Sequence, residues 1–280
     1  MYLRFFFVLM FVLSTVAPAK EVVIPRTSHY DARDNFYPVE LLQFVLKKAG
    51  YDFTLKVSED IYSQSRIVER IKTNKLDVFW MGTSASYEEE LHAIPYPIYR
   101  GLTGYRIFII HRDNQVDFNE VNYLEDLQSF KGLQGVGWSD IEILEFSGLK
   151  QDQALYDNLF EMINLGRGDY FSRSLPEIFF ELAYRQTWLK NLTAEKKLLL
   201  VYPFALFFFT NKGNTELSSA IEQGFQLAYE DGSFLSFFYQ HPDIISAIER
   251  ANIDQRHRIE IPNPALTQKT RNIPKRYWHE

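Results

Sequence analysis

The sequence contains no cysteine among its 280 residues. Disulfide bonds, thiolate metal sites and cysteine nucleophiles are therefore excluded. The fold must be held by its hydrophobic core alone, and 46% of the residues are hydrophobic. Aromatic residues are abundant, with 24 phenylalanines and 17 tyrosines. These rings either fill the core or line a pocket for a small ligand.

The sequence also lacks an excess of positive charge and any recognisable catalytic motif. Its formal net charge is −6, whereas nucleic-acid binders usually carry a basic patch, so we expect no nucleic-acid partner. Neither G-x-S-x-G nor H-E-x-x-H is present, and no glycine-rich loop could cradle a phosphate. The six histidines are scattered without metal-ligand spacing. We therefore expect no catalytic residues, no metal, no cofactor and no enzyme activity.

The apolar run at the N-terminus is too short to span a membrane. Residues 5–16 are mostly apolar and follow Arg4, and residues 17–19 have the small-residue pattern that a signal peptidase reads. A membrane-spanning helix needs about 20 apolar residues. We interpret residues 1–19 as a cleavable signal peptide and expect a periplasmic protein that starts near Lys20. An uncleaved anchor is the alternative.

Strand and helix patterns alternate after this segment. Residues 22–25 and 76–80 are typical of buried strands, and residues 53–57 alternate with strand periodicity. Apolar residues at helical spacing predict helices over 38–49 and 65–73. The order strand–helix–strand–helix–strand predicts an α/β fold with a parallel sheet.

The pattern returns in the middle third of the chain. We expect a strand at 135–138, an amphipathic helix over 152–165 and a strand at 168–171. Residues 101–110 and 198–210 are two apolar segments that are candidates for strands crossing between two bodies of the fold.

Two crossings divide the chain into two lobes. We assign residues 20–107 to lobe 1, residues 108–203 to lobe 2, and residues 204–280 to lobe 1 again, together with a tail. A cleft is then expected between the lobes, and the two crossing strands act as its hinge.

The order of these elements, together with four short motifs, resembles the extracellular solute-binding proteins of family 3, which have the type II periplasmic-binding-protein fold. The motifs are Lys75-Leu76-Asp77, Ile94-Pro95-Tyr96-Pro97-Ile98-Tyr99, Gly166-Arg167-Gly168-Asp169 and Ala228-Tyr229-Glu230-Asp231-Gly232-Ser233-Phe234. The resemblance covers nearly all of the chain after the signal. It implies a monomer whose lobes close around a small-molecule ligand and present it to a membrane permease or a membrane-bound signalling protein.

Two positions depart from the amino-acid binders of this family. Those proteins carry an Arg twelve residues after the strand-entry Asp to clamp the ligand carboxylate, but Glu89 stands at that distance from Asp77. They also keep an Asp in lobe 2 to hold the ligand ammonium, and counting from Asp169 gives Ser174 there. A standard α-amino acid is therefore not the expected ligand.

In lobe 1, four residues are candidates for ligand contact. Trp80, Gly82 and Ser84 leave the end of a buried strand, where open α/β sheets place their ligands. Trp80 either stacks on the ligand or belongs to the core. Tyr30 lies in the first loop, which faces the cleft in the resembling fold.

In lobe 2, three more residues are candidates. Trp138 precedes a helix start, and Asp140 either caps that helix or faces the ligand. Arg173 either pairs with an anion or is a solvated surface residue. Glu177, after Pro176, is interpreted as a first-turn acid favoured by the helix dipole.

Three functions remain open from these residues. The first is delivery of a solute to a transporter, and the second is presentation of a ligand to a membrane-bound receptor. The third is a dehydratase-like enzyme, since a few proteins of the resembling fold have become enzymes. The sequence does not name the ligand.

Overall fold

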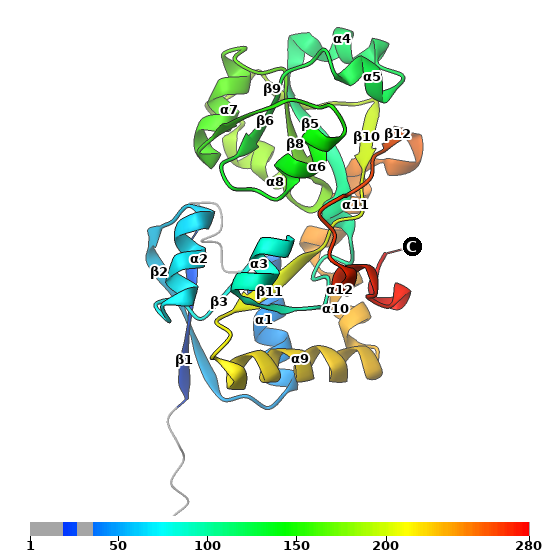
Figure 1. Ribbon diagram of the computed structural model, residues 1–280. Helices are drawn as coiled ribbons and strands as arrows, with labels where there is room; N and C mark the ends of the chain where they lie inside the picture. The colour runs from blue at the N-terminus through cyan, green and yellow to red at the C-terminus, as the bar shows by residue number, and fades with distance from the viewer. Residues whose placement is uncertain (1–18, 27–35, 280) are drawn as a thin grey trace, which may run out of the picture.

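Two lobes, one above the other in Figure 1, are built from segments that alternate along the chain. The structure, a computed structural model, describes residues 19–26 and 36–279. Nearly all of the expected signal peptide, and the candidate Tyr30, lie outside the described residues. Within the two described ranges, no helix is both long and apolar enough to cross a membrane.

Lobe 1 contains the first part of the chain and much of its last third. In this lobe, β1 pairs in parallel with β2, and β11 pairs antiparallel with both β3 and β4. Its elements are β1 (Lys20–Arg26), α1 (Tyr37–Lys48), β2 (Phe53–Ile61), α2 (Gln64–Lys72), β3 (Val78–Gly82), α3 (Ala85–Glu90), β4 (His92–Ile94), β11 (Leu206–Thr210), α9 (Thr215–Glu230), α10 (Ser233–Gln240) and α12 (Gln268–Arg271).

Lobe 2 is organised around one sheet with strand order β12-β10-β5-β8-β6-β7, and β9 also pairs with β5. Its elements are β5 (Tyr105–His111), α4 (Gln115–Glu120), α5 (Leu124–Leu127), β6 (Gly132–Gly135), α6 (Asp140–Phe146), β7 (Gln151–Ala154), α7 (Tyr156–Asn164), β8 (Tyr170–Ser174), α8 (Leu175–Arg185), β9 (Leu192–Ala194), β10 (Leu198–Val201) and β12 (His257–Glu260). Strands β6, β7 and β8 are parallel, whereas β5 is antiparallel to both β8 and β10. The α/β class is confirmed, and the sheet is mixed rather than wholly parallel.

The chain passes between the lobes twice in its first 210 residues and twice more near its end. The first passage leads into β5, and the second lies between β10 and β11. Between α10 and β12, α11 (Pro242–Ala251) places Ala247 and Ala251 in the lobe 2 core. Strand β12 then pairs with β10 before the chain returns to α12. We expected all of residues 204–280 in lobe 1 and its tail; instead β12 covers the edge that β10 would otherwise leave unpaired.

Residues 151–154 also differ from the expectation of one helix over 152–165. They form β7, which pairs in parallel with β6, and α7 begins only at Tyr156. The helical spacing of the apolar residues holds for Leu159, Phe160 and Ile163, which are buried. Residues 151–154 instead form a strand, because pairing with β6 satisfies the backbone hydrogen-bonding groups of both strands.

Most of the aromatic side chains fill the cores of the two lobes. In lobe 1, the rings of Tyr96 and Phe225 stack with centroids 4.8 Å apart, and Phe208 packs on Phe225. In lobe 2, the rings of Phe108 on β5 and Tyr170 on β8 pack in a tilted arrangement, with centroids 4.6 Å apart. The high aromatic content therefore mainly reflects packing in the two cores, and only a minority of these rings reach the cleft.

Helices α1 and α9 approach so closely that only glycine fits at position 224. A Cβ atom on Gly224 would lie 2.6 Å from the carbonyl carbon of Val45 and would also collide with its oxygen. We expect Gly224→Ala to lower the free energy of unfolding by about 1–3 kcal/mol through overpacking. In an exposed helix the same change would stabilise by about 1 kcal/mol.

Chemical denaturation measures this difference. Gly213→Ala is the control, because a Cβ there meets only the side chain of Asn211, at 3.2 Å. Equal stability of the two variants would contradict the close approach of α1 and α9.

Candidate functional site

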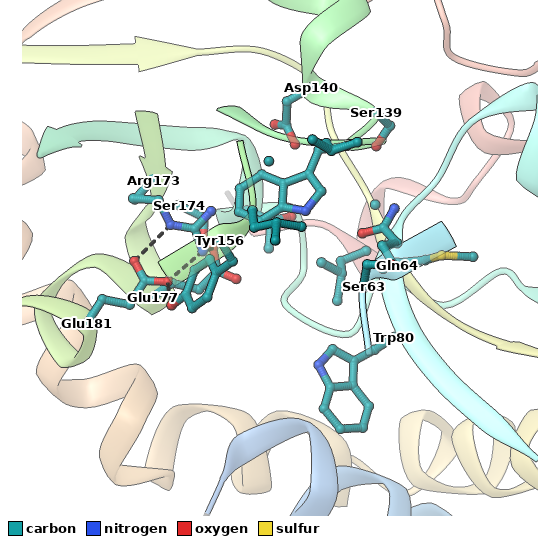
Figure 2. A pocket seen from close by; sticks show the side chains of 18 of the residues that line it. Ser63, Gln64, Trp80, Ser139, Asp140, Tyr156, Arg173, Ser174, Glu177 and Glu181 are labelled. Atoms are coloured by element: carbon teal, nitrogen blue, oxygen red, sulfur yellow. Dashed lines mark hydrogen bonds and ion pairs between the residues drawn. The ribbon is translucent and has the colours of Figure 1, made fainter. Parts of the chain in front are cut away.

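A cavity of about 520 Å³ lies between the lobes and is lined by residues of both. Figure 2 shows Trp80 of lobe 1 on one side and the group Tyr156, Arg173, Glu177 and Glu181 of lobe 2 on another. A volume of this size is within the range of small-ligand sites.

The described lobe 1 wall is uncharged and combines aromatic rings with polar side chains such as Ser63 and Gln64. Trp80 projects from β3, is 8% exposed, and meets the rings of Phe36 and Phe208 edge-on at 5.7 and 6.4 Å. Phe36 and Phe79 line the cavity beside it. Trp80 therefore packs in the core and also lines the cavity. Among the described lining residues of this lobe, none carries a charge.

The end of β3 places Gly82 at the cavity but turns Ser84 away from it. A Cβ on Gly82 would lie 2.6 Å from Ser139 Oγ in lobe 2 and would collide with Phe204. Ser84 Oγ instead accepts a hydrogen bond from the backbone N–H of Tyr87 at 3.3 Å and caps α3. Ser84 is not among the residues that line the cavity.

Glu89 is exposed on α3 and does not line the cavity. Its neighbour Glu88 is partly buried and accepts hydrogen bonds from Thr83, Thr267 and Thr270. The acidic run at 88–90 therefore tethers the C-terminal segment to lobe 1 through one of its three carboxylates.

Trp138 lines the cavity from lobe 2, and its indole ring is in contact with a cationic side chain. The Arg173 guanidinium lies 4.7 Å from the centroid of the indole ring. Tyr156, also at the cavity, is 6.1 Å from the same indole. Cation–π attraction stabilises this arrangement and fixes the orientation of the indole.

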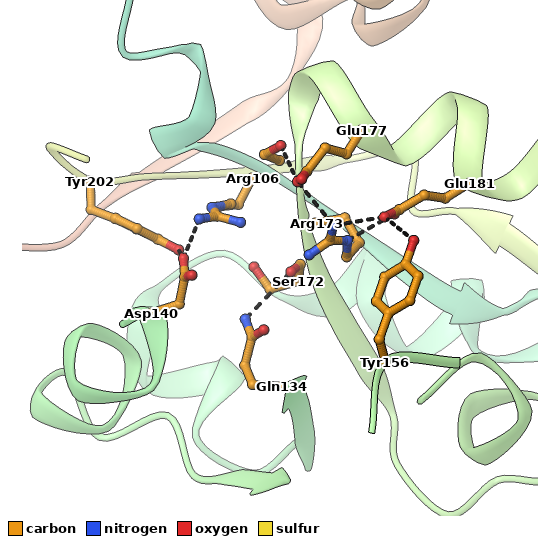
Figure 3. Close-up of polar contacts among 10 residues, drawn as sticks. Arg106, Gln134, Asp140, Tyr156, Ser172, Arg173, Glu177, Glu181 and Tyr202 are labelled. Carbon is orange, nitrogen blue, oxygen red and sulfur yellow. Dashed lines mark hydrogen bonds and ion pairs between the residues drawn. The ribbon is translucent and has the colours of Figure 1, made fainter. Parts of the chain in front are cut away.

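Arg173 is buried, at 4% exposure, and is held by two carboxylates (Figure 3). Its Nε and Nη2 atoms donate to the two carboxylate oxygens of Glu181 at 2.8 and 2.7 Å. Nη2 also lies 3.0 Å from Glu177 Oε2, and Tyr156 donates its hydroxyl proton to Glu181 at 2.6 Å. Arg173 is thus neither a surface residue nor free to take an anion, because its partners belong to the protein.

The pKa values in this group follow from burial and pairing. Burial alone would raise the pKa of Glu181, but the charge and hydrogen bonds of Arg173 outweigh it and lower the pKa. Burial opposes the charge on Arg173, yet Glu177 and Glu181 raise its pKa well above the usual value. Burial, reinforced by Glu181, raises the pKa of Tyr156 well above 10.0, so the hydroxyl keeps its proton. The group is a fixed ion pair at neutral pH.

Asp140 belongs to a second buried ion pair at the cavity. Its carboxylate accepts hydrogen bonds from Arg106 of β5 and from the hydroxyl of Tyr202 (Figure 3). Its side chain is 8% exposed, and the N-cap position of α6 belongs to Ser139, because Asp140 is the first residue of the helix. Asp140 lines the cavity, and its charge is balanced by Arg106.

Sequence reasoning did not select Glu181, Tyr156, Phe36 or Phe204 as site residues. Glu177 and Glu181 are four residues apart on α8, which places two acids on one helix face beside Arg173. That spacing was the available signal for Glu181. The ring of Tyr156 reaches the site only because β7 ends just before it, which local patterns did not show.

Within the described ranges, no group of three or more His, Asp or Glu side chains could hold a metal ion. The polar groups at the cavity instead bond to one another.

Neither a protein-family model nor a curated protein sequence matches the chain. Solved structures do match it. A structure described as an ancestral arginine-binding protein bound to glutamine superposes with a TM-score of 0.60, 15% sequence identity, and coverage of 81% of this chain and 100% of that one. The chain has the type II periplasmic-binding-protein fold.

Two further structures with this fold show how varied its uses are. A histidine kinase sensor domain with similarity to periplasmic binding proteins matches with a TM-score of 0.59 and 16% identity, over 80% of this chain and 96% of that one. An ancestral amino acid-binding protein, described as a precursor of cyclohexadienyl dehydratase, matches with a TM-score of 0.58 and 14% identity, over 79% and 94%. At these identities the likeness establishes the fold alone.

The buried pair of Arg173 and Glu181 predicts a pH-dependent contribution to stability. Glu181→Gln removes one partner of a buried pair and should lower the free energy of unfolding at pH 7 by about 3–5 kcal/mol. Folding lowers the pKa of Glu181, so its contribution is present above the unfolded pKa of about 4.3 and is lost as the pH falls toward the folded value. The difference between wild type and variant should therefore shrink below about pH 4.

Urea denaturation across pH 3–7 measures this difference. Asp152→Asn is the control, because its ion pair with Lys131 is half-exposed and should contribute little. A Glu181→Gln variant as stable as wild type at pH 7 would contradict the pairing.

Proposed function

We propose that the protein is an exported, monomeric solute-binding protein of the periplasm. Its lobes close on a small molecule that is not a standard α-amino acid. The loaded form is presented to a membrane transporter or to a membrane signalling receptor. The observation that supports this proposal most directly is the cavity shared by the two lobes, with an indole from each lobe on its walls.

The residues proposed to contact the ligand are Trp80 and Gly82 in lobe 1 and Trp138 and Asp140 in lobe 2, all of which line the cavity. Arg173 contributes by holding Trp138 in place. The absence of charge on the described lobe 1 wall argues against a carboxylate clamp of the amino-acid type.

Contacts across the cavity mouth support closure as the mechanism. The hydroxyl of Tyr87 in lobe 1 donates to the carbonyl oxygen of Gly137 in lobe 2 at 2.7 Å, and Gln64 Nε2 reaches the same oxygen at 3.3 Å. A ligand that touches both lobes stabilises the closed form by its differential binding energy. These contacts add to that stabilisation.

Trp138→Ala should abolish ligand-induced thermal stabilisation. A library of amines, sugars, organic acids, nucleobases and peptides is first screened on wild type by thermal shift, because a saturating ligand stabilises the state that binds it. The variant should then give no shift with the compounds that stabilise wild type. Trp188→Ala, which removes an indole that is 55% exposed, serves as the control and should keep the full shift. Full shifts with Trp138→Ala would contradict this site.

Tyr87→Phe should weaken ligand binding roughly 2- to 10-fold, because one inter-lobe hydrogen bond contributes about 0.5–1.5 kcal/mol. Titration calorimetry measures the affinity, and small-angle X-ray scattering reports the fraction of closed protein. Tyr51→Phe is the control, since Tyr51 lies between α1 and β2. If Tyr87→Phe matched Tyr51→Phe in both measurements, the contact would not contribute to closure.

A dehydratase-like enzyme is the second candidate, and one observation favours it. Glu177 is a partly exposed carboxylate at the cavity that could carry a proton. Incubation of the protein with each stabilising compound, followed by mass spectrometry, distinguishes the two functions. A binding protein returns the compound unchanged, whereas a dehydratase returns a product lighter by one water.

A further inference from the structure

The described residues that line the cavity carry more negative than positive charge. Its described lining residues include two arginines and four carboxylates, which are Arg106, Arg173, Asp140, Asp157, Glu177 and Glu181. In a cavity walled by protein, an unbalanced charge acts strongly on any ligand, because the local dielectric constant is lower than that of water. A charged side chain in the lining that has no neutralising partner of its own therefore influences which ligands the cavity binds.

Three of the four carboxylates are each neutralised by an arginine side chain. Asp140 is paired with Arg106, and Glu181 forms the two-point contact with Arg173. Asp157 is paired at 2.7 Å with Arg185, which stands behind the cavity wall. Glu177 is the carboxylate that remains.

Glu177 and Glu181 both pair with the same cation, Arg173. Its side chain is 28% exposed, and its carboxylate contacts Ser174 Oγ and Arg173 Nη2. Because Arg173 already neutralises Glu181, the three side chains together hold one net negative charge. That charge lies at the cavity and is accessible.

The rest of the cavity suits a flat or apolar frame. Trp80 offers an indole from lobe 1 and Trp138 one from lobe 2, with Phe36 and Phe79 beside Trp80. Aromatic faces attract cations as well as apolar groups. Both arginines at the described walls are engaged with carboxylates, so neither is available for a ligand carboxylate.

We propose that the cavity binds a small organic amine that has one cationic nitrogen on an aromatic or apolar frame and no carboxylate. The ammonium group contacts Glu177, and the frame lies between Trp80 and Trp138. This inference rests on the proposed solute-binding function and names the chemical class of its ligand.

The test compares probes that share a ring but differ in charge. Tryptamine and phenethylamine carry the amine alone, tryptophan and phenylalanine add a carboxylate, indole-3-propionate carries only the acid, and 3-methylindole is neutral. Titration calorimetry with the full chain should show the two amines binding at least tenfold more tightly than the amino acids. Indole-3-propionate should be the weakest probe.

Glu177→Gln should weaken binding of the amines about 10- to 100-fold, because a charge-assisted hydrogen bond is lost. Binding of 3-methylindole should be unchanged. Glu177→Asp keeps the charge and should retain part of the amine affinity, which separates loss of charge from misfolding. Glu161→Gln, on an exposed position of α7, is the matched control and should change neither.

Two outcomes would overturn this inference while leaving the proposed function intact. In the first, a carboxylate, sugar or nucleobase binds in a Trp138-dependent manner and no amine does. In the second, the amines bind equally well to wild type and Glu177→Gln. If no compound of any class gives a Trp138-dependent shift, the proposed function itself fails and the inference fails with it.

Discussion

The buried guanidinium of Arg173 is the constraint around which the lobe 2 wall is organised. A charge removed from water must be paired, or it costs several kcal/mol. Glu181 and Glu177 supply the pairing from α8, and Tyr156 completes the hydrogen bonds of Glu181 from α7. The flat face of the same cation supports Trp138. One side chain therefore sets the positions of two helices and of an indole at the cavity.

The two walls of the cavity differ in kind. The lobe 2 wall carries buried ion pairs and the partly exposed carboxylate of Glu177, whereas the described lobe 1 wall is uncharged and combines aromatic with polar side chains. Neither lobe alone encloses the cavity, because residues of both lobes line it. Near its end the chain crosses to β12 and returns to α12, which adds two connections between the lobes beyond the two expected crossings.

Sequence periodicity was sufficient for the fold and for part of the site. The helix at α1 follows from Pro38 and the spacing of its apolar residues, and the strand before Gly82 follows from its continuous apolar run. Local patterns failed where pairing with a distant strand decides the conformation. Strand β7 forms against β6, and β12 forms against β10, although their own sequences are polar. Whether a strand finds an unpaired sheet edge depends on strands that are distant in the sequence. A short stretch of sequence contains no information about those strands.

The sequence by itself determined the α/β class, the two-lobed arrangement, the lack of thiol chemistry and the absence of an Arg at the position of Glu89. Only the tertiary structure decided what Arg173 does. Nothing near Arg173 in the sequence distinguishes a solvated guanidinium from a buried one, because Glu181 lies on the next helix and Trp138 is 35 positions away. The net charge of the cavity lining likewise depends on ion pairs between residues that come together only in the folded protein. A charged side chain can act on a ligand with its full charge only if the fold has not already neutralised that charge.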